Sequence, residues 1–225
     1  MRRALRDNGL TFFFLFLFVA TVALQAVAGH AYENDELVSH GLAPISFGEF
    51  VTSSTFMVDL SENWQSEFLQ FFVFILATVW LVQRGSPESK KPGDEGLGSD
   101  EDQMIAEHSR RDSPAWARVR GIRLWLYSDS LLIVMGLVFL LSWFAQSLAG
   151  HAVANEEAAQ HGELPITWGA YVMDPEFWNR TLQNWQSEFL AVGCMVAFSI
   201  YLRQRGSAES KPVGTPNGVS ALESE

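Results

Sequence analysis

The sequence predicts an all-α integral membrane protein with four transmembrane helices, built as two tandem helical hairpins. Two observations lead to this fold class. Residues 25–90 and 146–211 align without a gap at an offset of 121 residues, and 29 of these 66 positions are identical. Each half also contains an uncharged run of 20 residues, at 10–29 and 131–150. At about 1.5 Å per residue, such a run is long enough to cross a hydrocarbon core of about 30 Å.

The first hairpin is predicted over residues 1–90, with spans at about 10–29 and 64–82 and an outer loop at 30–63. Its start is also typical of a signal peptide, because Arg2 and Arg3 precede an apolar run that ends in small residues. The second copy carries the same ending deep inside the chain. We therefore expect the first span to be retained.

The second hairpin is predicted over residues 113–211, with spans at about 131–150 and 185–202 and an outer loop at 151–184. The second span of each copy reaches membrane length only if the polar block before it is included. Ser113 and Pro114 predict the start of one basic interfacial helix that continues through Trp125. The linker 91–112 and the tail 212–225 are rich in turn-forming and acidic residues and are predicted to be disordered.

Charge placement predicts the orientation. Of the 15 Lys and Arg residues, 14 lie in the termini or the central segment, and the two outer loops share only Arg180. Positive residues stay on the cytoplasmic side. Both termini are therefore predicted to be cytoplasmic and both loops extracytoplasmic, with a pseudo-twofold axis along the membrane normal. The net charge of −11 comes from exposed loops and linker and indicates no nucleic-acid partner.

Helix starts can be predicted inside the outer loops. Ser53 and Asp174 occupy the same repeat position, and both are good N-caps, so helices of about 28 residues should begin there and run to Val82 and Arg203. Ser46 and Glu49 form a capping box for a shorter helix just before. In the second copy Ala170 replaces the glutamate of the box.

A repeated polar block gives the first candidate site. Its members lie near the outer edge of the apolar zone: Gln25, Asn63, Ser66, Glu67, Gln146, Asn184, Ser187 and Glu188. A carboxylate at that depth is a functional hypothesis, since it is unfavourable there unless paired or hydrated. The alternative, which we favour, is that these residues join the helices through hydrogen bonds.

Four histidines form the second candidate site, because they are repeated: His30, His40, His151 and His161. With the neighbouring acids they could hold a divalent metal or sense pH. Their spacing of ten residues matches no compact ligand motif, so no cofactor is expected. Trp64 and Trp185 are expected as interfacial anchors, and so are Arg84 and Arg205 at the other helix ends.

Four sequence motifs resemble those of a known protein family. They are Arg-Asp-Asn-Gly-Leu ending at Leu10, Gln-x-x-Ala-Gly-His ending at His30, Asn-Trp-Gln-Ser-Glu-Phe ending at Phe68, and Gln-Arg-Gly-Ser-x-Glu-Ser-Lys ending at Lys90. The chain resembles a family of small bacterial four-span inner-membrane proteins classed only as a domain of unknown function. The resemblance implies a bacterial inner-membrane location and no particular activity.

The sequence contains no phosphate-binding glycine loop, nucleophile elbow or cysteine pair, so an enzyme is not expected. The predicted function is a structural or interaction module in the lipid bilayer, with a second copy or another membrane protein as partner. The alternative is a small transporter or channel component that handles protons or cations through Glu67 and Glu188.

Overall fold

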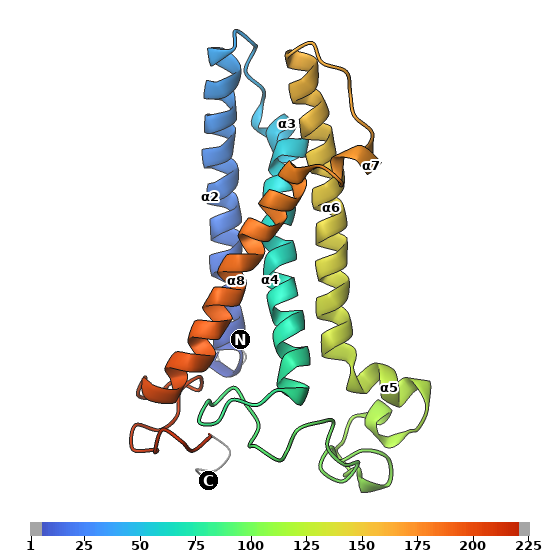
Figure 1. The fold of residues 1–225 in the computed structure, drawn as a ribbon, viewed down its shortest axis with the longest axis vertical. Helices are drawn as coiled ribbons and strands as arrows, with labels where there is room; N and C mark the ends of the chain where they lie inside the picture. The colour runs from blue at the N-terminus through green and yellow to red at the C-terminus, as the bar shows by residue number, and fades with distance from the viewer. Residues whose placement is uncertain (1–5, 221–225) are drawn as a thin grey trace. The chain divides into compact units, whose positions relative to one another are not determined.

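The computed structural model describes residues 6–220, and all regular structure in this range is helical (Figure 1). The all-α prediction is therefore confirmed. Four long helices account for most of it: α2 (Gly9–Ser39), α4 (Ser54–Trp80), α6 (Ser130–Gln160) and α8 (Pro175–Tyr201). The shorter helices are α3 (Phe47–Val51), α5 (Ile122–Ser128) and α7 (Trp168–Tyr171), with two 3-10 turns, η1 (Ala106–His108) and η2 (Ala115–Arg118).

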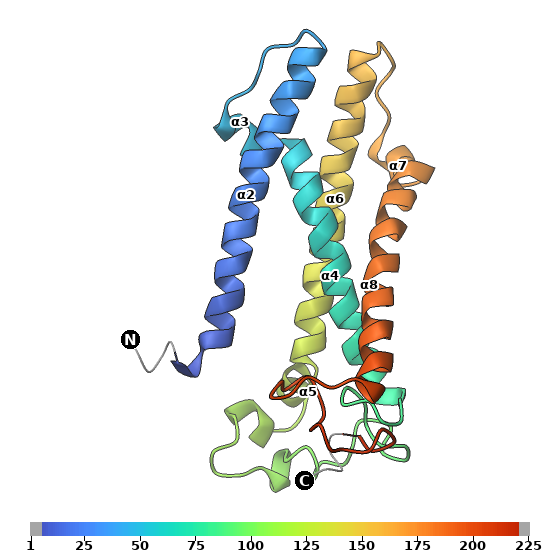
Figure 2. The same cartoon turned by 90° about the vertical axis from the view of Figure 1, so that its left-hand side faces the viewer.

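The long helices of the two halves match in length and in position. Both α2 and α6 have 31 residues, and both α4 and α8 have 27. Helices α6 and α8 begin and end 121 residues after α2 and α4, which is the offset of the sequence alignment. A short helix, α3 or α7, precedes the second long helix of each half (Figure 2).

The predicted N-caps are confirmed in both halves. The Ser53 hydroxyl accepts a hydrogen bond from the Phe56 amide at 3.2 Å, and the Asp174 carboxylate accepts one from the Glu176 amide at 2.8 Å. Such bonds satisfy amides that have no partner within the first helical turn. Pro175 adds a ring-fixed φ at the first helical position of α8.

The short helix α3 has the predicted capping box. The Ser46 amide donates to Glu49 Oε2 at 2.7 Å, and the Ser46 hydroxyl accepts from the Glu49 amide at 3.3 Å. The bond from the Ser46 backbone lowers the pKa of the Glu49 carboxyl. In the second half Thr167 still accepts from the Ala170 amide at 3.2 Å, but alanine returns no bond, as the sequence predicts.

Helices α4 and α8 end two residues before the predicted Val82 and Arg203. The reason lies in the turn that follows. The Gln83 amide donates to the Ser89 hydroxyl at 2.7 Å, and the Gln204 amide donates to the Ser210 hydroxyl at 2.9 Å. An amide that is bonded to a serine side chain is not available to continue the helical ladder.

Within residues 6–220, two helices, α2 and α6, are long enough and apolar enough, by length and composition, to cross a membrane. In the most apolar stretch of each, few residues are buried: 6% for α2 and 22% for α6. Of the four predicted spans, two thus have the required composition. Helices α4 and α8 have sufficient length, but the polar block in their first halves lowers their mean hydropathy.

The prediction of one basic interfacial helix is wrong. Residues 113–128 instead form η2 and α5, separated by an extended Val119 and by Gly121. Gly121 has φ of +80° and ψ of −152°, a conformation that residues with a Cβ atom rarely adopt. The apolar spacing through Trp125 is helical, but the backbone turns at the glycine. Residues 91–112 form turns and the 3-10 helix η1.

The chain divides into two compact units. The first contains residues up to Ser61 together with Ala145–Val172, and the second contains Glu62–Phe144 with the chain from Met173 onward. In the first unit α3 lies against α2 (Figure 2), and a small core forms around Ala26, Phe50 and Phe56. Aromatic residues form the core of the second unit.

Candidate functional site

In the first unit, His30 and Asn34 on α2 hold the backbone of the outer loop at Ile45. The Asn34 side chain pairs with this residue on both sides: Oδ1 accepts from the Ile45 amide at 2.7 Å, and Nδ2 donates to the Ile45 carbonyl at 3.1 Å. His30 Nε2 lies 2.8 Å from the same carbonyl and 2.9 Å from Asn34 Nδ2. A loop carbonyl and amide that would otherwise lack partners are thus bonded.

The second half repeats this arrangement, which we call the loop clamp, atom for atom. Asn155 Oδ1 accepts from the Ile166 amide at 2.8 Å, and Asn155 Nδ2 lies 3.2 Å from the Ile166 carbonyl. His151 Nε2 lies 2.8 Å from that carbonyl and 2.9 Å from Asn155 Nδ2. The two asparagines were missed as candidate residues. Their signal was available, since Asn34 and Asn155 are identical at one repeat position.

The glycine before each clamp histidine allows an aromatic ring to approach the helix. A Cβ atom added to Gly29 would lie 2.7 Å from Phe50 Cζ, and one added to Gly150 would lie 2.1 Å from Tyr171 Oη. Both aromatic side chains are buried, at 2% and 6% exposure. The repeated Ala-Gly-His sequence therefore has a packing explanation.

The other two histidines, His40 and His161, lie at helix ends. Each directs Nδ1 to the carbonyl oxygen one turn earlier, Glu36 at 3.0 Å and Glu157 at 2.8 Å. This is a C-terminal helix contact. Among residues 6–220, no group of three or more His, Cys, Asp or Glu has the arrangement of a metal site. In the structure the four histidines contact helix ends and loop carbonyls.

Acidic side chains gather in the same unit. Partial burial raises the pKa of Glu33, and the negative charges of Glu156, Glu36 and Asp59 raise it further. Glu33 thus holds its proton more firmly than an isolated carboxyl would.

In the second unit, polar residues join α4 to α8. Arg180 Nη2 and Asn184 Nδ2 on α8 each donate to the Glu62 carboxylate at 2.8 Å, one to each oxygen. Three residues further along α4, Gln65 Oε1 accepts from Trp185 Nε1 at 2.6 Å. The Glu62 side chain is only 12% exposed, and Gln65 is fully buried. Charge-assisted bonds of this kind are the stronger class.

The members of the predicted polar block lie in different environments. Ser66 and Gln146 are buried, Gln25 and Glu188 are half-buried, and Asn63, Glu67 and Ser187 are exposed. Ser66 and Ser187 donate to carbonyls of their own helices. Asn184 alone among the eight makes the α4–α8 contact described above, and Glu67 and Glu188 are close enough for their charges to interact.

Three residues of the α4–α8 contact were missed by sequence reasoning: Glu62, Gln65 and Arg180. Glu62 and Arg180 differ from their repeat counterparts, which are Gln183 and Asp59. Because neither residue is identical in the two copies, the repeat alone does not identify them. Gln65 is identical to Gln186, but the predicted polar face contained Asn63, Ser66 and Glu67 and did not include Gln65.

Aromatic rings surround this contact. The Trp143 ring centroid lies 5.8 Å from Trp185, 5.7 Å from Trp178 and 6.3 Å from Phe177. The expected membrane anchor Trp185 thus packs within the protein, whereas Trp64 is 37% exposed. Four buried polar atoms of this unit have no hydrogen-bond partner: Gln65 Nε2, Trp143 Nε1, Thr181 Oγ1 and Arg203 Nε.

The Gln-Arg-Gly-Ser motif forms the same closed loop in both halves. The Ser86 hydroxyl accepts from the Glu88 amide at 3.2 Å, and the Ser207 hydroxyl accepts from the Glu209 amide at 3.1 Å. The glycines have φ of +85° and +84°, which explains why each loop needs glycine. The repeated motif is therefore a helix-ending turn with a fixed hydrogen-bond pattern.

Lys211 closes the second of these loops. Its ammonium is buried, and Nζ donates to the carbonyls of Gly85 at 2.5 Å, Val219 at 2.9 Å and Asn217 at 3.0 Å. Burial, followed by the charge of Arg203, lowers the pKa of Lys211. The loops thus join residues from both halves of the chain.

Two carboxyls also meet here. Burial raises the pKa of Glu88, and the charge of Glu209 and a hydrogen bond to it raise it further. A carboxyl that lies against a second carboxyl holds its proton more firmly than an isolated one. The two loops therefore bring a carboxyl from each half of the chain into contact.

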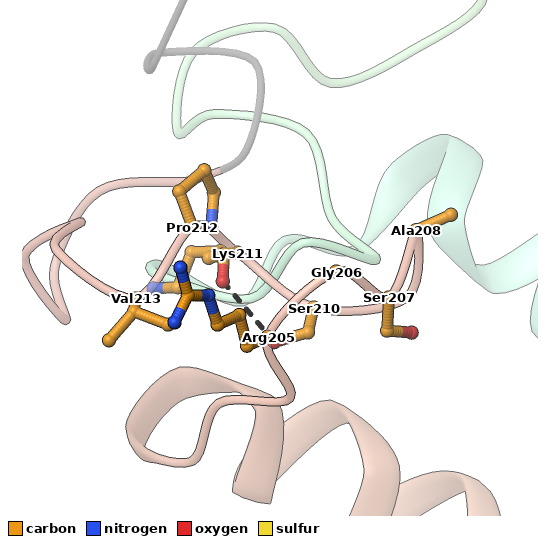
Figure 3. A pocket seen from close by; sticks show the side chains of 8 residues that line it. All are labelled: Arg205, Gly206, Ser207, Ala208, Ser210, Lys211, Pro212 and Val213. Carbon is orange, nitrogen blue, oxygen red and sulfur yellow. Dashed lines mark hydrogen bonds between the residues drawn. The ribbon is translucent and has the colours of Figure 1, made fainter.

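An open hollow of about 690 Å³ lies beside this loop (Figure 3). Its lining residues are Arg205, Gly206, Ser207, Ala208, Ser210, Lys211, Pro212 and Val213. Arg84 and Arg205, the expected headgroup anchors, are both exposed at this end of the helices.

The duplicated motifs thus have structural roles as a loop clamp, a contact between α4 and α8, and a helix-ending loop. No characterised protein and no solved structure matches the chain significantly. A family profile matches residues 1–221, nearly the whole length of the chain. The chain belongs to this family, which is described as a domain of unknown function (DUF6766).

Proposed function

We propose that the chain is a four-span protein of the bacterial inner membrane that acts as a structural or interaction module and not as an enzyme. Its two halves are tandem copies of one hairpin, with the termini in the cytoplasm and loops 30–63 and 151–184 outside. Support comes from the two apolar helices α2 and α6, whose apolar stretches are mostly exposed, and from helix bounds that recur at the sequence offset.

The observation that carries the proposal is that repeated polar residues form hydrogen bonds to other parts of the fold. Asn184 and Trp185 bind Glu62 and Gln65 on the neighbouring helix. His30 and His151 bind loop carbonyls. Hydrogen bonds of this kind hold membrane helices together, at about 0.6–2 kcal/mol each. Asn184, Trp185 and the two clamp histidines thus support the assembly of the fold.

The second candidate function is proton or cation handling by Glu67 and Glu188. The observation in its favour is that the two repeated carboxylates lie close enough for their negative charges to interact. This function predicts that flux depends on both carboxylates.

The experiment that separates the two functions replaces both carboxylates, with E67Q/E188Q in proteoliposomes. A module predicts unchanged folding and no difference in pH-driven or cation-driven flux from the wild type. If the wild type shows flux above protein-free vesicles and the variant abolishes it while remaining folded, the module is contradicted and the transporter supported. The matched control is E36Q, which removes an exposed carboxylate from the end of α2.

A further inference from the structure

The contact between α4 and α8 is directional. Helix α4 supplies the hydrogen-bond acceptors, Glu62 and Gln65, and α8 supplies the donors, from Arg180, Asn184 and Trp185. We call the α4 positions the receiving face and the α8 positions the inserting face. Two different faces in contact make a heterologous interface, which can be repeated from one hairpin to the next.

Because the hairpins are related by the 121-residue offset, each helix carries both faces. On α8 the receiving positions are Gln183 and Gln186, and on α4 the inserting positions are Asn63 and Trp64. Three of these four residues are identical to their counterparts in the α4–α8 contact. The same residue types, a glutamine and a tryptophan among them, therefore occupy the equivalent positions of a second such contact.

The two receiving faces differ in burial. On α4, Val58, Ser61 and Gln65 are all at most 4% exposed. On α8 the equivalent residues are exposed, with Leu182 at 51%. They line an open hollow of about 390 Å³: Asn179, Leu182, Gln183 and Gln186. A surface that is filled in one half of the chain is thus open in the other.

We propose that a second copy of this chain binds the receiving face of α8 through the inserting face of its own α4. This proposal rests on the proposed function and names the partner of the module. Within the chain, α8 already binds the receiving face of α4. The receiving face of α8 is open and can bind a partner. Two chains supply four hairpins, and a head-to-tail contact between them closes a ring when the rotation permits.

The polar groups also match across this contact. Within the chain, the carboxylate of Glu62 on α4 meets the guanidinium of Arg180 on α8. At the equivalent positions α4 carries Asp59 and α8 carries Gln183. A glutamine amide can donate to that carboxylate as well as accept from Asn63. A carboxylate thus meets a donor in both contacts, and neither leaves two like charges opposed.

The first test measures the mass of the purified protein in detergent by light scattering across a range of concentrations. We expect twice the chain mass of 25.2 kDa or a higher whole-number multiple. The variant L182R places a charge on the receiving face of α8 and should raise the dissociation constant by more than about tenfold, with unchanged helical content. The control L164R alters a loop residue that is 87% exposed and should leave the mass unchanged.

The second test identifies the contact itself and does not depend on how L182R folds. In a C194S background, chains carrying W64C and chains carrying Q186C are tagged differently and co-expressed in membranes. A short bismaleimide should link the two kinds of chain to each other. A monomeric wild type at all concentrations, or no W64C-to-Q186C product while both chains are folded and membrane-inserted, would overturn the proposal and leave the membrane fold intact.

Discussion

The contact between Glu62 and Arg180 gives the sharpest prediction of stability. The perturbation is E62Q, which keeps the shape of the side chain and one acceptor for Asn184 but removes the charge. Exposed ion pairs contribute about 0.2–1 kcal/mol, and breaking a fully buried pair costs about 3–5 kcal/mol. The Glu62 side chain is 12% exposed and that of Arg180 is 35%, so this pair lies between those limits.

We therefore expect E62Q to lower the free energy of unfolding by about 1–2 kcal/mol, which is a factor of about 5 to 30 in the folding equilibrium. The assay is reversible unfolding in mixed detergent micelles, followed by tryptophan fluorescence. A double-mutant cycle with R180Q should give a coupling energy above about 0.5 kcal/mol. Additive effects of E62Q and R180Q, or an effect no larger than that of the exposed-loop control E163Q, would refute the reasoning.

Two further predictions concern packing and pH. G150A should destabilise the fold by about 1–3 kcal/mol because its Cβ would overlap the buried Tyr171 ring, and Y171F should restore part of the loss. The helical control G193A, which has open space around it, should be neutral or stabilising in the same unfolding assay. E88Q should raise the melting temperature near pH 7 and have no effect near pH 4, because a carboxyl with a raised folded-state pKa destabilises the fold only when it loses its proton. A pH-independent effect of E88Q would contradict the shared-proton interpretation of Glu88 and Glu209.

The helical elements could be predicted because their signals are local. A cap is a single side chain that meets an amide two or three residues away, so Ser53, Asp174 and the Ser46 capping box are all evident in the sequence. The ends of α4 and α8 depend on a serine nine residues further on, and the predicted ends are two residues too late in both helices. The break at Gly121 depends on one backbone conformation that apolar periodicity does not report.

The candidate site was harder to predict because its contacts join distant parts of the chain. Glu62 and Arg180 are 118 residues apart, and neither is identical in the other copy. The repeat identified the positions that both halves share, such as Gly29 and His30. It could not identify residues that act in only one half. The structure shows that repeated identities here mark local turns and clamps, whereas the contact between helices also uses residues that differ.

The measurement that tests the four-span account most directly is cysteine accessibility in intact cells. In a C194S background, single cysteines are placed in each outer loop, A43C and E163C, and in the linker, D100C, and a membrane-impermeant maleimide is added before and after permeabilisation. The account predicts labelling of A43C and E163C in intact cells and labelling of D100C only after permeabilisation. Labelling of D100C in intact cells together with A43C would mean that α4 does not cross the membrane and would contradict the account.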